Sequence, residues 1–156
     1  MSTLSLYLIN AQQTHRLDAL PQALPDKGFV WWACTRSELE AGWADFHLHL
    51  QRLTGAAPIE LHQQDLLNAQ HPSHYDYTSD YDRIIFRRLV LGANGTAPAE
   101  PVAPPRKKSG PAILKYVATQ PIGFLLYDRL LVTVHPDGCA TAEDFVRRMT
   151  TEPPAR

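Results

Sequence analysis

Cysteine is scarce in this 156-residue chain, and the lack of cysteine pairs excludes several kinds of site. Cys34 and Cys139 lie far apart, and neither belongs to a C-x-x-C pair. Such spacing is typical of proteins in a reducing compartment and provides neither a zinc knuckle nor a redox-active pair. We therefore expect two ordinary, partly buried thiols.

A strong net charge and a long apolar run are also lacking. The 15 basic and 16 acidic residues give a formal net charge of -1, which provides no bulk attraction to nucleic acid or anionic lipid. The longest apolar stretch, residues 122–134, is interrupted by Asp128 and Arg129 and is not expected to span a bilayer. The first residues lack the basic and apolar regions of a signal peptide. We expect a soluble, cytoplasmic fragment.

Sequence motifs of catalysis are missing as well. The chain has no G-x-S-x-G elbow, no P-loop and no G-x-G-x-x-G pattern. Asp76, Asp80 and Asp82 form an acidic patch, but no matched base or metal motif accompanies them. Tryptophans and tyrosines are present without the basic groove that single-stranded nucleic acid requires. We predict that the chain is not an enzyme and does not bind nucleic acid.

The composition of the chain indicates one folded domain. Apolar residues make up 44% and charged residues 20%, which is ordinary for a globular protein of this length. We expect a single domain over residues 1–150 and a frayed tail over residues 151–156. Residues 92–112 contain five of the 13 prolines and a basic cluster, which predicts a mobile loop or a long hairpin tip.

Helical and strand patterns alternate in the first half of the chain. Residues 4–9 and 28–34 are apolar runs typical of strands. Thr35 with Glu38 three residues later has the spacing of a capping box, and apolar residues then recur at helical intervals up to Gly55. The sequence therefore predicts one long helix between Thr35 and Gly55.

The second half combines strands with two shorter helices. Ile84, Phe86 and Arg88 are expected to share one face of a strand over residues 81–91. The other expected elements are a short helix over 61–69, strands over 113–117, 122–127 and 130–134 with a tight turn between the last two, and a helix over 141–149. This order predicts an α/β fold, with a mixed β-sheet and helices packed on its faces in an α/β/α sandwich.

Three segments together resemble a known family. They are the Asp-Leu-Leu-Asn turn at residues 65–68, the strand that begins at Tyr81, and the paired strands PIGFLLYDRLLVTVH at residues 121–135. In their order and spacing they resemble the N-terminal cytoplasmic domain of the CorA-like family of magnesium and divalent-cation transporters. The resemblance extends over residues 28–149.

This resemblance implies a function for the chain and a role for Asp65. The chain is expected to be the cytoplasmic, metal-sensing regulatory domain of a magnesium transporter at the inner membrane. Its expected partners are its own stalk and transmembrane region, which lie outside these residues, and the other subunits of a homopentamer. Asp65 matches the family aspartate that binds Mg²⁺ together with an acid of a neighbouring stalk. Mg²⁺ keeps several waters and often uses one or two carboxylates, so the isolated fragment, which lacks the partner acid, should bind Mg²⁺ weakly.

Two alternatives remain open from the sequence. The seven histidines suggest Zn²⁺ and a zinc-transporting relative, and His71 and His74 share a segment with Asp76; without structural zinc spacing, we expect mostly surface histidines. A free-standing soluble interaction module is the other alternative, with the basic residues 106–108 as its docking element. For Asp65 itself, the simplest interpretation is a solvated helical residue.

Overall fold

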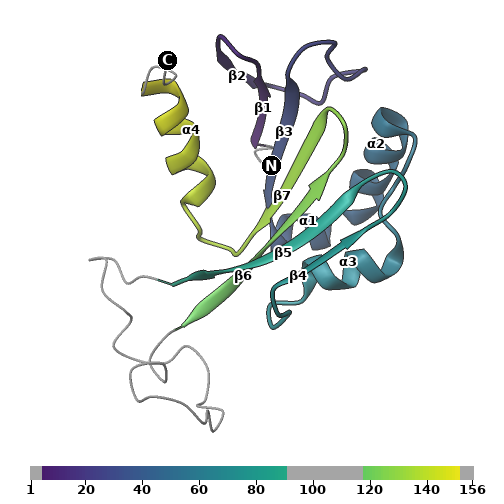
Figure 1. The fold of residues 1–156 in the computed structure, drawn as a ribbon, viewed down its shortest axis with the longest axis vertical. Helices are drawn as coiled ribbons and strands as arrows, with labels where there is room; N and C mark the ends of the chain where they lie inside the picture. Colours follow the sequence, from purple (N-terminus) through teal and green to yellow (C-terminus); the bar gives the residue numbers. More distant parts are fainter. Residues whose placement is uncertain (1–4, 91–117, 152–156) are drawn as a thin grey trace, which may run out of the picture.

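The computed structural model describes residues 5–90 and 118–151 and shows a mixed sheet flanked by helices (Figure 1). The elements in chain order are β1 (Ser5–Ile9), β2 (Thr14–Leu17), β3 (Phe29–Thr35), α1 (Arg36–Ala41), α2 (Trp43–Thr54), α3 (Glu60–Leu67), β4 (His74–Tyr77), β5 (Asp82–Leu89), β6 (Thr119–Leu126), β7 (Leu130–His135) and α4 (Thr141–Thr151). The predicted α/β fold class is confirmed.

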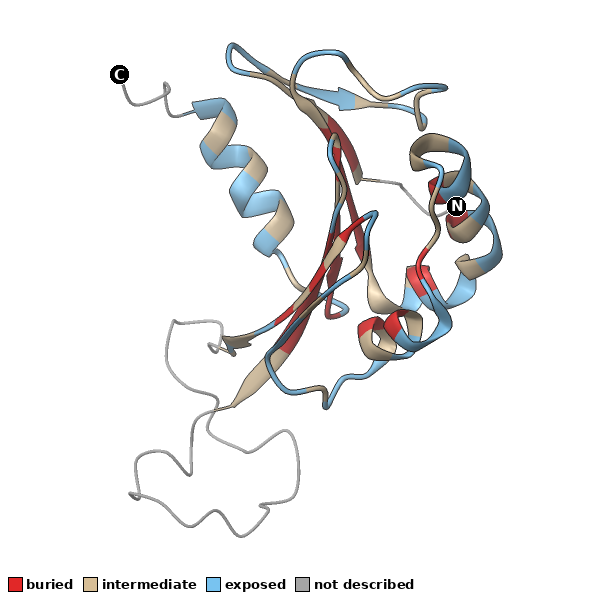
Figure 2. Cartoon of the chain, turned by 45° about the vertical axis from the view of Figure 1, so that its right-hand side comes forward, coloured by how far each residue is buried: buried red, intermediate tan, exposed pale blue. Residues whose placement is uncertain are grey.

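The sheet of the described residues has seven strands in the order β2-β1-β3-β7-β6-β5-β4. Only the pairing of β3 with β7 is parallel, and this central pair brings the two halves of the chain together. Helices α1, α2 and α3 lie on one face of the sheet, and α4 lies on the other, over the end formed by β1, β3 and β7 (Figures 1 and 2). Buried residues concentrate along the central strands between these layers.

The main core lies between the sheet and helices α1–α3. Leu6, Trp32, Val132 and Leu125 occupy one row across four neighbouring strands, and all are buried. Leu39, Phe46, Leu50 and Leu66 pack on them from the helices. Burial of each such side chain contributes about 1.5–3 kcal/mol relative to its exposed state.

The predicted capping box at Thr35 is present. Its hydroxyl accepts a hydrogen bond from the backbone of Glu38 at 3.2 Å, and the Glu38 carboxylate accepts one from the Thr35 backbone at 2.8 Å. The prediction of one continuous helix is wrong, because the helix ends at Gly42 and a second begins at Trp43. Gly42 has φ -108° and ψ 17°, outside helical geometry. Gly55 ends α2, as predicted, and does so in a left-handed conformation.

Two short edge strands, β2 and β4, were not predicted. Both have four residues and are largely exposed, so neither shows the apolar alternation of a strand with one buried face. The tight turn after β6 is confirmed by a hydrogen bond from Tyr127 N–H to Leu130 C=O at 2.9 Å. The predicted loop 92–112, the predicted strand 113–117 and most of the predicted tail lie outside the described residues.

A smaller apolar cluster joins α4 to the sheet. Tyr7, Trp31 and Ala33 are buried there, and Val146 and Met149 of α4 pack against them. Both cysteines are free thiols, and burial raises the pKa of Cys34 to about 12, so that this thiol stays protonated. None of the helices within residues 5–90 and 118–151 is long and apolar enough to span a membrane.

Candidate functional site

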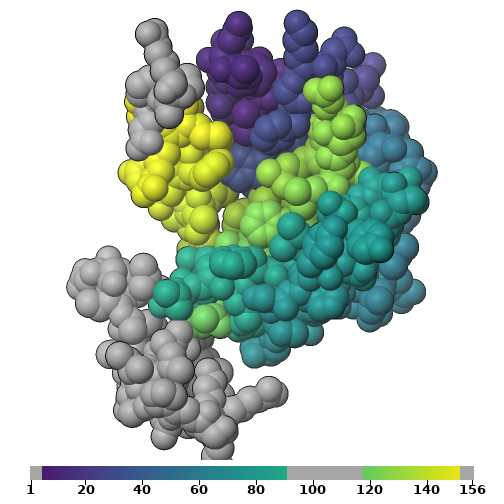
Figure 3. Space-filling model, viewed as in Figure 1, coloured from purple at the N-terminus to yellow at the C-terminus, as the bar shows by residue number. Residues whose placement is uncertain are grey.

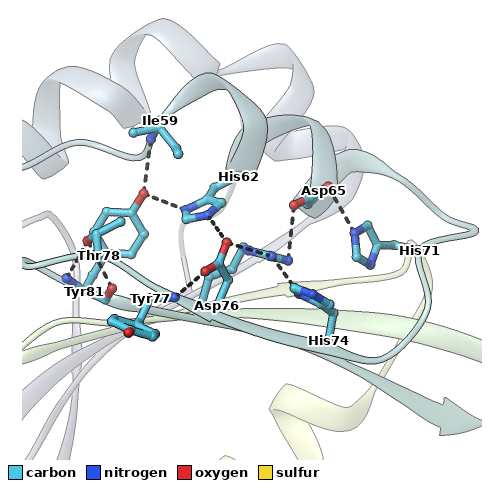
Figure 4. A network of polar contacts seen from close by, with 10 residues as sticks. Ile59, His62, Asp65, His71, His74, Asp76, Tyr77, Thr78 and Tyr81 are labelled. Carbon is cyan, nitrogen blue, oxygen red and sulfur yellow. Dashed lines mark hydrogen bonds and ion pairs between the residues drawn. The ribbon is translucent and has the colours of Figure 1, made fainter.

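Asp65 lies on α3 and faces the sheet, where two side chains hold its carboxylate (Figure 4). Oδ2 is 3.2 Å from Nη1 of Arg83, and Oδ1 is 3.0 Å from Nε2 of His71. Its side chain is only 16% exposed. The interpretation of Asp65 as a solvated helical residue is therefore wrong, because the carboxylate is an internal ion-pair partner.

Arg83 provides the central positive charge of this site. It lies on β5 with a relative exposure of 1%, and a buried guanidinium needs acidic partners to offset its lost hydration. A second carboxylate, that of Asp76, has Oδ2 3.7 Å from Nη2, and His74 Nδ1 is 3.0 Å from the same nitrogen. The contact of Nη1 with Asp65 is close but not aligned as a hydrogen bond.

A hydrogen-bonded relay connects Asp76 to the start of α3. The Ile59 backbone N–H donates to Tyr81 Oη at 3.1 Å, Tyr81 Oη is 2.8 Å from His62 Nδ1, and His62 Nε2 is 3.1 Å from Asp76 Oδ2. A carboxylate only accepts, so Nε2 carries the proton, and Tyr81 donates its own proton to Nδ1. The bond from His62, with one from the Tyr77 backbone, lowers the pKa of Asp76 below its usual 3.8.

The relay and the ion pairs form one network that ties α3 to β4 and β5. We call it the α3 network: His62, Asp65, His71, His74, Asp76, Tyr81 and Arg83 (Figure 4). Its two carboxylates are matched by one permanent cation and by imidazole donors. Across residues 5–90 and 118–151, no three histidine, cysteine, aspartate or glutamate side chains are grouped closely enough to hold a metal ion. The network can therefore offer a cation single carboxylates, supplemented by water or by a second chain.

The sequence brought some of these residues to notice and missed others. Asp65 was singled out, whereas Arg83 was interpreted only as a strand residue and Tyr81 as the start of that strand and a packing aromatic. The expectation of surface histidines is wrong for His62, which is 1% exposed; His135 at the end of β7 is also buried, at 6% exposed. His62 stands one helical turn before the buried Leu66, and this spacing is a signal that could have placed it on the inner face of α3.

The architecture defines a structural class. A mixed seven-stranded sheet with three helices on one face and α4 on the other matches the soluble domain of CorA-type transporters over the whole chain. The predicted resemblance in fold to a CorA-like cytoplasmic domain is thereby confirmed.

Three solved structures illustrate the match. The soluble domain of CorA from Methanocaldococcus jannaschii aligns with 100% of this chain and 50% of its own, at a TM-score of 0.57 and 16% identity. The full-length CmaX protein aligns with 94% of this chain and 38% of its own length, at a TM-score of 0.56 and 15% sequence identity. The ZntB cytoplasmic domain from Vibrio parahaemolyticus aligns with 96% of this chain and 50% of its own length, at a TM-score of 0.55 and 10% sequence identity.

These likenesses concern the fold. The chain spans half of the two soluble domains and less than half of CmaX. No protein-family model matches the chain, and no curated protein matches it.

Proposed function

We propose that this chain is a cytoplasmic regulatory domain of a CorA-like divalent-cation transporter, with Mg²⁺ as the expected ion. The observation that carries the proposal is the structural match of the entire chain to half of the CorA soluble domain from Methanocaldococcus jannaschii. In this proposal the stalk and transmembrane region belong to other parts of a homopentameric protein. The docking role considered for residues 106–108 lies outside the described residues.

Asp65 is the proposed point of contact with the cation. Its carboxylate is partly exposed, at 16%, and lies at the end of α3. Arg83 holds Oδ2 from inside the domain, whereas His71 holds Oδ1 from a loop. A cation would therefore reach Oδ1 by displacing His71, and Arg83 would keep the carboxylate in place. Competition with His71 supports weak binding in the isolated domain, with a second acid from a neighbouring subunit needed for tight binding.

The proposal is tested by the effect of Mg²⁺ on thermal unfolding. Because a ligand that binds the folded state raises the melting temperature, MgCl₂ at constant ionic strength should stabilise the wild-type chain. The Asp65→Asn variant should show no rise above its own baseline. Asp128→Asn is the matched control, since it removes a carboxylate that is 94% exposed on a hairpin turn.

The outcomes separate the parts of the proposal. Equal stabilisation of the wild type and the Asp65→Asn variant would remove Asp65 as the ligand while leaving cation sensing in place. A response to Zn²⁺ without a response to Mg²⁺ would favour the zinc-transporting alternative. No response to either cation in the wild type would contradict cation sensing by this domain.

A further inference from the structure

The loop after α3 carries the side chain that occupies one oxygen of Asp65. His71 Nε2 is 3.0 Å from Oδ1, and its ring lies beside the carboxylate in Figure 4. The other ring nitrogen, Nδ1, is 2.7 Å from the carbonyl oxygen of Pro72 in the same loop. Because the ring moves with its own backbone, the group that holds this loop also holds His71 on Asp65.

Arg87 of β5 binds the loop from the sheet. Its Nη1 donates to the carbonyl oxygen of His71 at 2.8 Å, and its backbone N–H donates to Ser73 Oγ at 3.1 Å. Arg83 and Arg87 are four residues apart on one strand, so both lie on the face of the sheet that carries α3. Strand β5 therefore contacts both partners of the ion pair, the carboxylate through Arg83 and the loop of His71 through Arg87.

Thr119, the first residue of β6, fixes the guanidinium of Arg87 in place. Nε donates to Thr119 Oγ1 at 2.8 Å, and Nη2 donates to the Thr119 carbonyl oxygen at 2.7 Å. Strands β5 and β6 are paired, and their teal and green atoms adjoin in Figure 3. No acid within residues 5–90 and 118–151 forms an ion pair with Arg87. The planar fork of Arg87 thus joins two backbone carbonyl groups, an arrangement that the compact ammonium of lysine does not reproduce.

We infer that Arg87 is a positioning residue that keeps His71 on Asp65 and thereby lowers the affinity of this site for a divalent cation. Its hydrogen bonds raise the fraction of molecules in which His71 occupies Oδ1, and only the remaining fraction offers this oxygen to a cation. By linkage, a bound cation weakens the hold of Arg87 on the loop to the same extent. The inference rests on the proposed function of Asp65 as the point of contact with the cation.

The test compares variants of the whole chain by NMR titration with MgCl₂ at constant pH and ionic strength, with the Asp65 carboxyl carbon as the signal. Arg87→Lys keeps the positive charge and loses the fork. It should bind Mg²⁺ about two- to tenfold more tightly than the wild type, the factor that one hydrogen bond contributes to an equilibrium. His71→Ala, which removes the competing ring, should gain at least as much.

The double variant shows whether Arg87 acts through His71. Arg87→Lys combined with His71→Ala should bind Mg²⁺ as tightly as His71→Ala alone, because the loop then carries no competitor to release. Arg88→Lys is the matched control, since Arg88 is the next residue of β5 and lies on the opposite face of the sheet. Its affinity for Mg²⁺ should equal that of the wild type.

A second readout needs no cation. In the metal-free Arg87→Lys variant, the His71 Nε2 signal should move toward that of the exposed His15. Thr119→Val removes the hydroxyl that accepts from Arg87 Nε, and it should change both readouts in the same direction by a smaller amount.

The outcomes separate this inference from the function on which it rests. Absence of Mg²⁺ binding at Asp65 in both the wild type and His71→Ala would contradict the proposed function, and with it the effect on affinity. Tighter binding by His71→Ala, with wild-type affinity and an unchanged His71 signal in Arg87→Lys and Thr119→Val, would overturn the inference alone. Weaker binding by Arg87→Lys would also overturn it, because Arg87 would then only stabilise the fold.

Discussion

Arg83 holds Asp65 inside the domain: Nη1 of the buried guanidinium is 3.2 Å from Oδ2 of the carboxylate that the sequence singled out as a metal ligand. The same guanidinium contacts Asp76 at 3.7 Å. Asp65 therefore has a structural partner of its own, whether or not a cation binds, and the α3 network fixes where its remaining oxygen points.

Arg83→Met should destabilise the domain strongly, because it leaves two acids facing a buried site without their cation. We expect a loss of about 3–5 kcal/mol in the free energy of unfolding, the usual cost of breaking a buried ion pair. Denaturant unfolding at neutral pH measures this loss of free energy of unfolding. Arg129→Met is the control. Arg129 is 43% exposed, and its ion pair within the described residues is with the exposed Asp128, so the loss of free energy of unfolding there should stay within about 1 kcal/mol. A loss of similar size in both variants would contradict the central role of Arg83.

Tyr81→Phe tests the relay at the start of α3. The substitution removes the only hydroxyl in this relay, which leaves the Ile59 N–H and His62 Nδ1 without a partner. Unsatisfied buried groups cost about 1–3 kcal/mol, and we expect a loss of that size in the free energy of unfolding. Tyr77→Phe removes an exposed hydroxyl on the other face and should change it by less than about 0.5 kcal/mol. Equal stability of Tyr81→Phe and the wild type would show that the relay adds no stability.

Gly123→Ala tests the contact between β6 and α3. A Cβ at Gly123 would come within 2.4 Å of Leu66 Cδ2, a distance that requires the buried Leu66 side chain, or α3 with it, to shift. We expect a destabilisation of about 1–3 kcal/mol from overpacking. In the double variant with Leu66→Ala the two effects should not add, because the smaller side chain makes room for the new methyl group. Additive losses would mean that the helix and the strand are not in contact as described.

The pH dependence of stability tests the buried state of His135. Burial, followed by the charge of Arg88, lowers the pKa of His135 from 6.5 to about 4. Between these values the unfolded chain binds a proton that the folded chain excludes, so stability falls as the pH falls from 6.5 toward 4. The slope from this group is at most about 1.4 kcal/mol per pH unit.

His135→Gln isolates this contribution from those of the other histidines. The variant should lose stability less steeply than the wild type over the same pH range, as measured by denaturant unfolding at several pH values. Parallel curves for the two proteins would show that His135 does not titrate as a buried group.

Local signals in the sequence predicted local structure well. The capping box at Thr35, the left-handed cap at Gly55 and the turn after β6 depend on residues within a few positions of one another, and all three are present. The break at Gly42 was missed because the apolar spacing continues through it. Strand β4 was missed because its residues are polar or exposed.

The candidate site was predicted only in part, because its residues are far apart in the sequence. Asp65 was found by its resemblance to a family motif, but its partner Arg83 lies 18 positions later on a strand. Only the sheet register that places Arg83 opposite Asp76 brings the α3 network together. Likewise, His135 meets Trp31 through Thr133 because β3 and β7 pair in parallel.

The most direct test of the account is an NMR titration of the chain with MgCl₂, which observes the Asp65 carboxyl carbon and the His71 imidazole nitrogens. The account predicts millimolar binding that shifts the Asp65 signal and releases His71 Nε2 from its contact, while Arg83 keeps its place. An NaCl titration at equal ionic strength should leave both signals unchanged. Shifts confined to exposed acids such as Asp128, with Asp65 and His71 unaffected, would contradict cation sensing through Asp65.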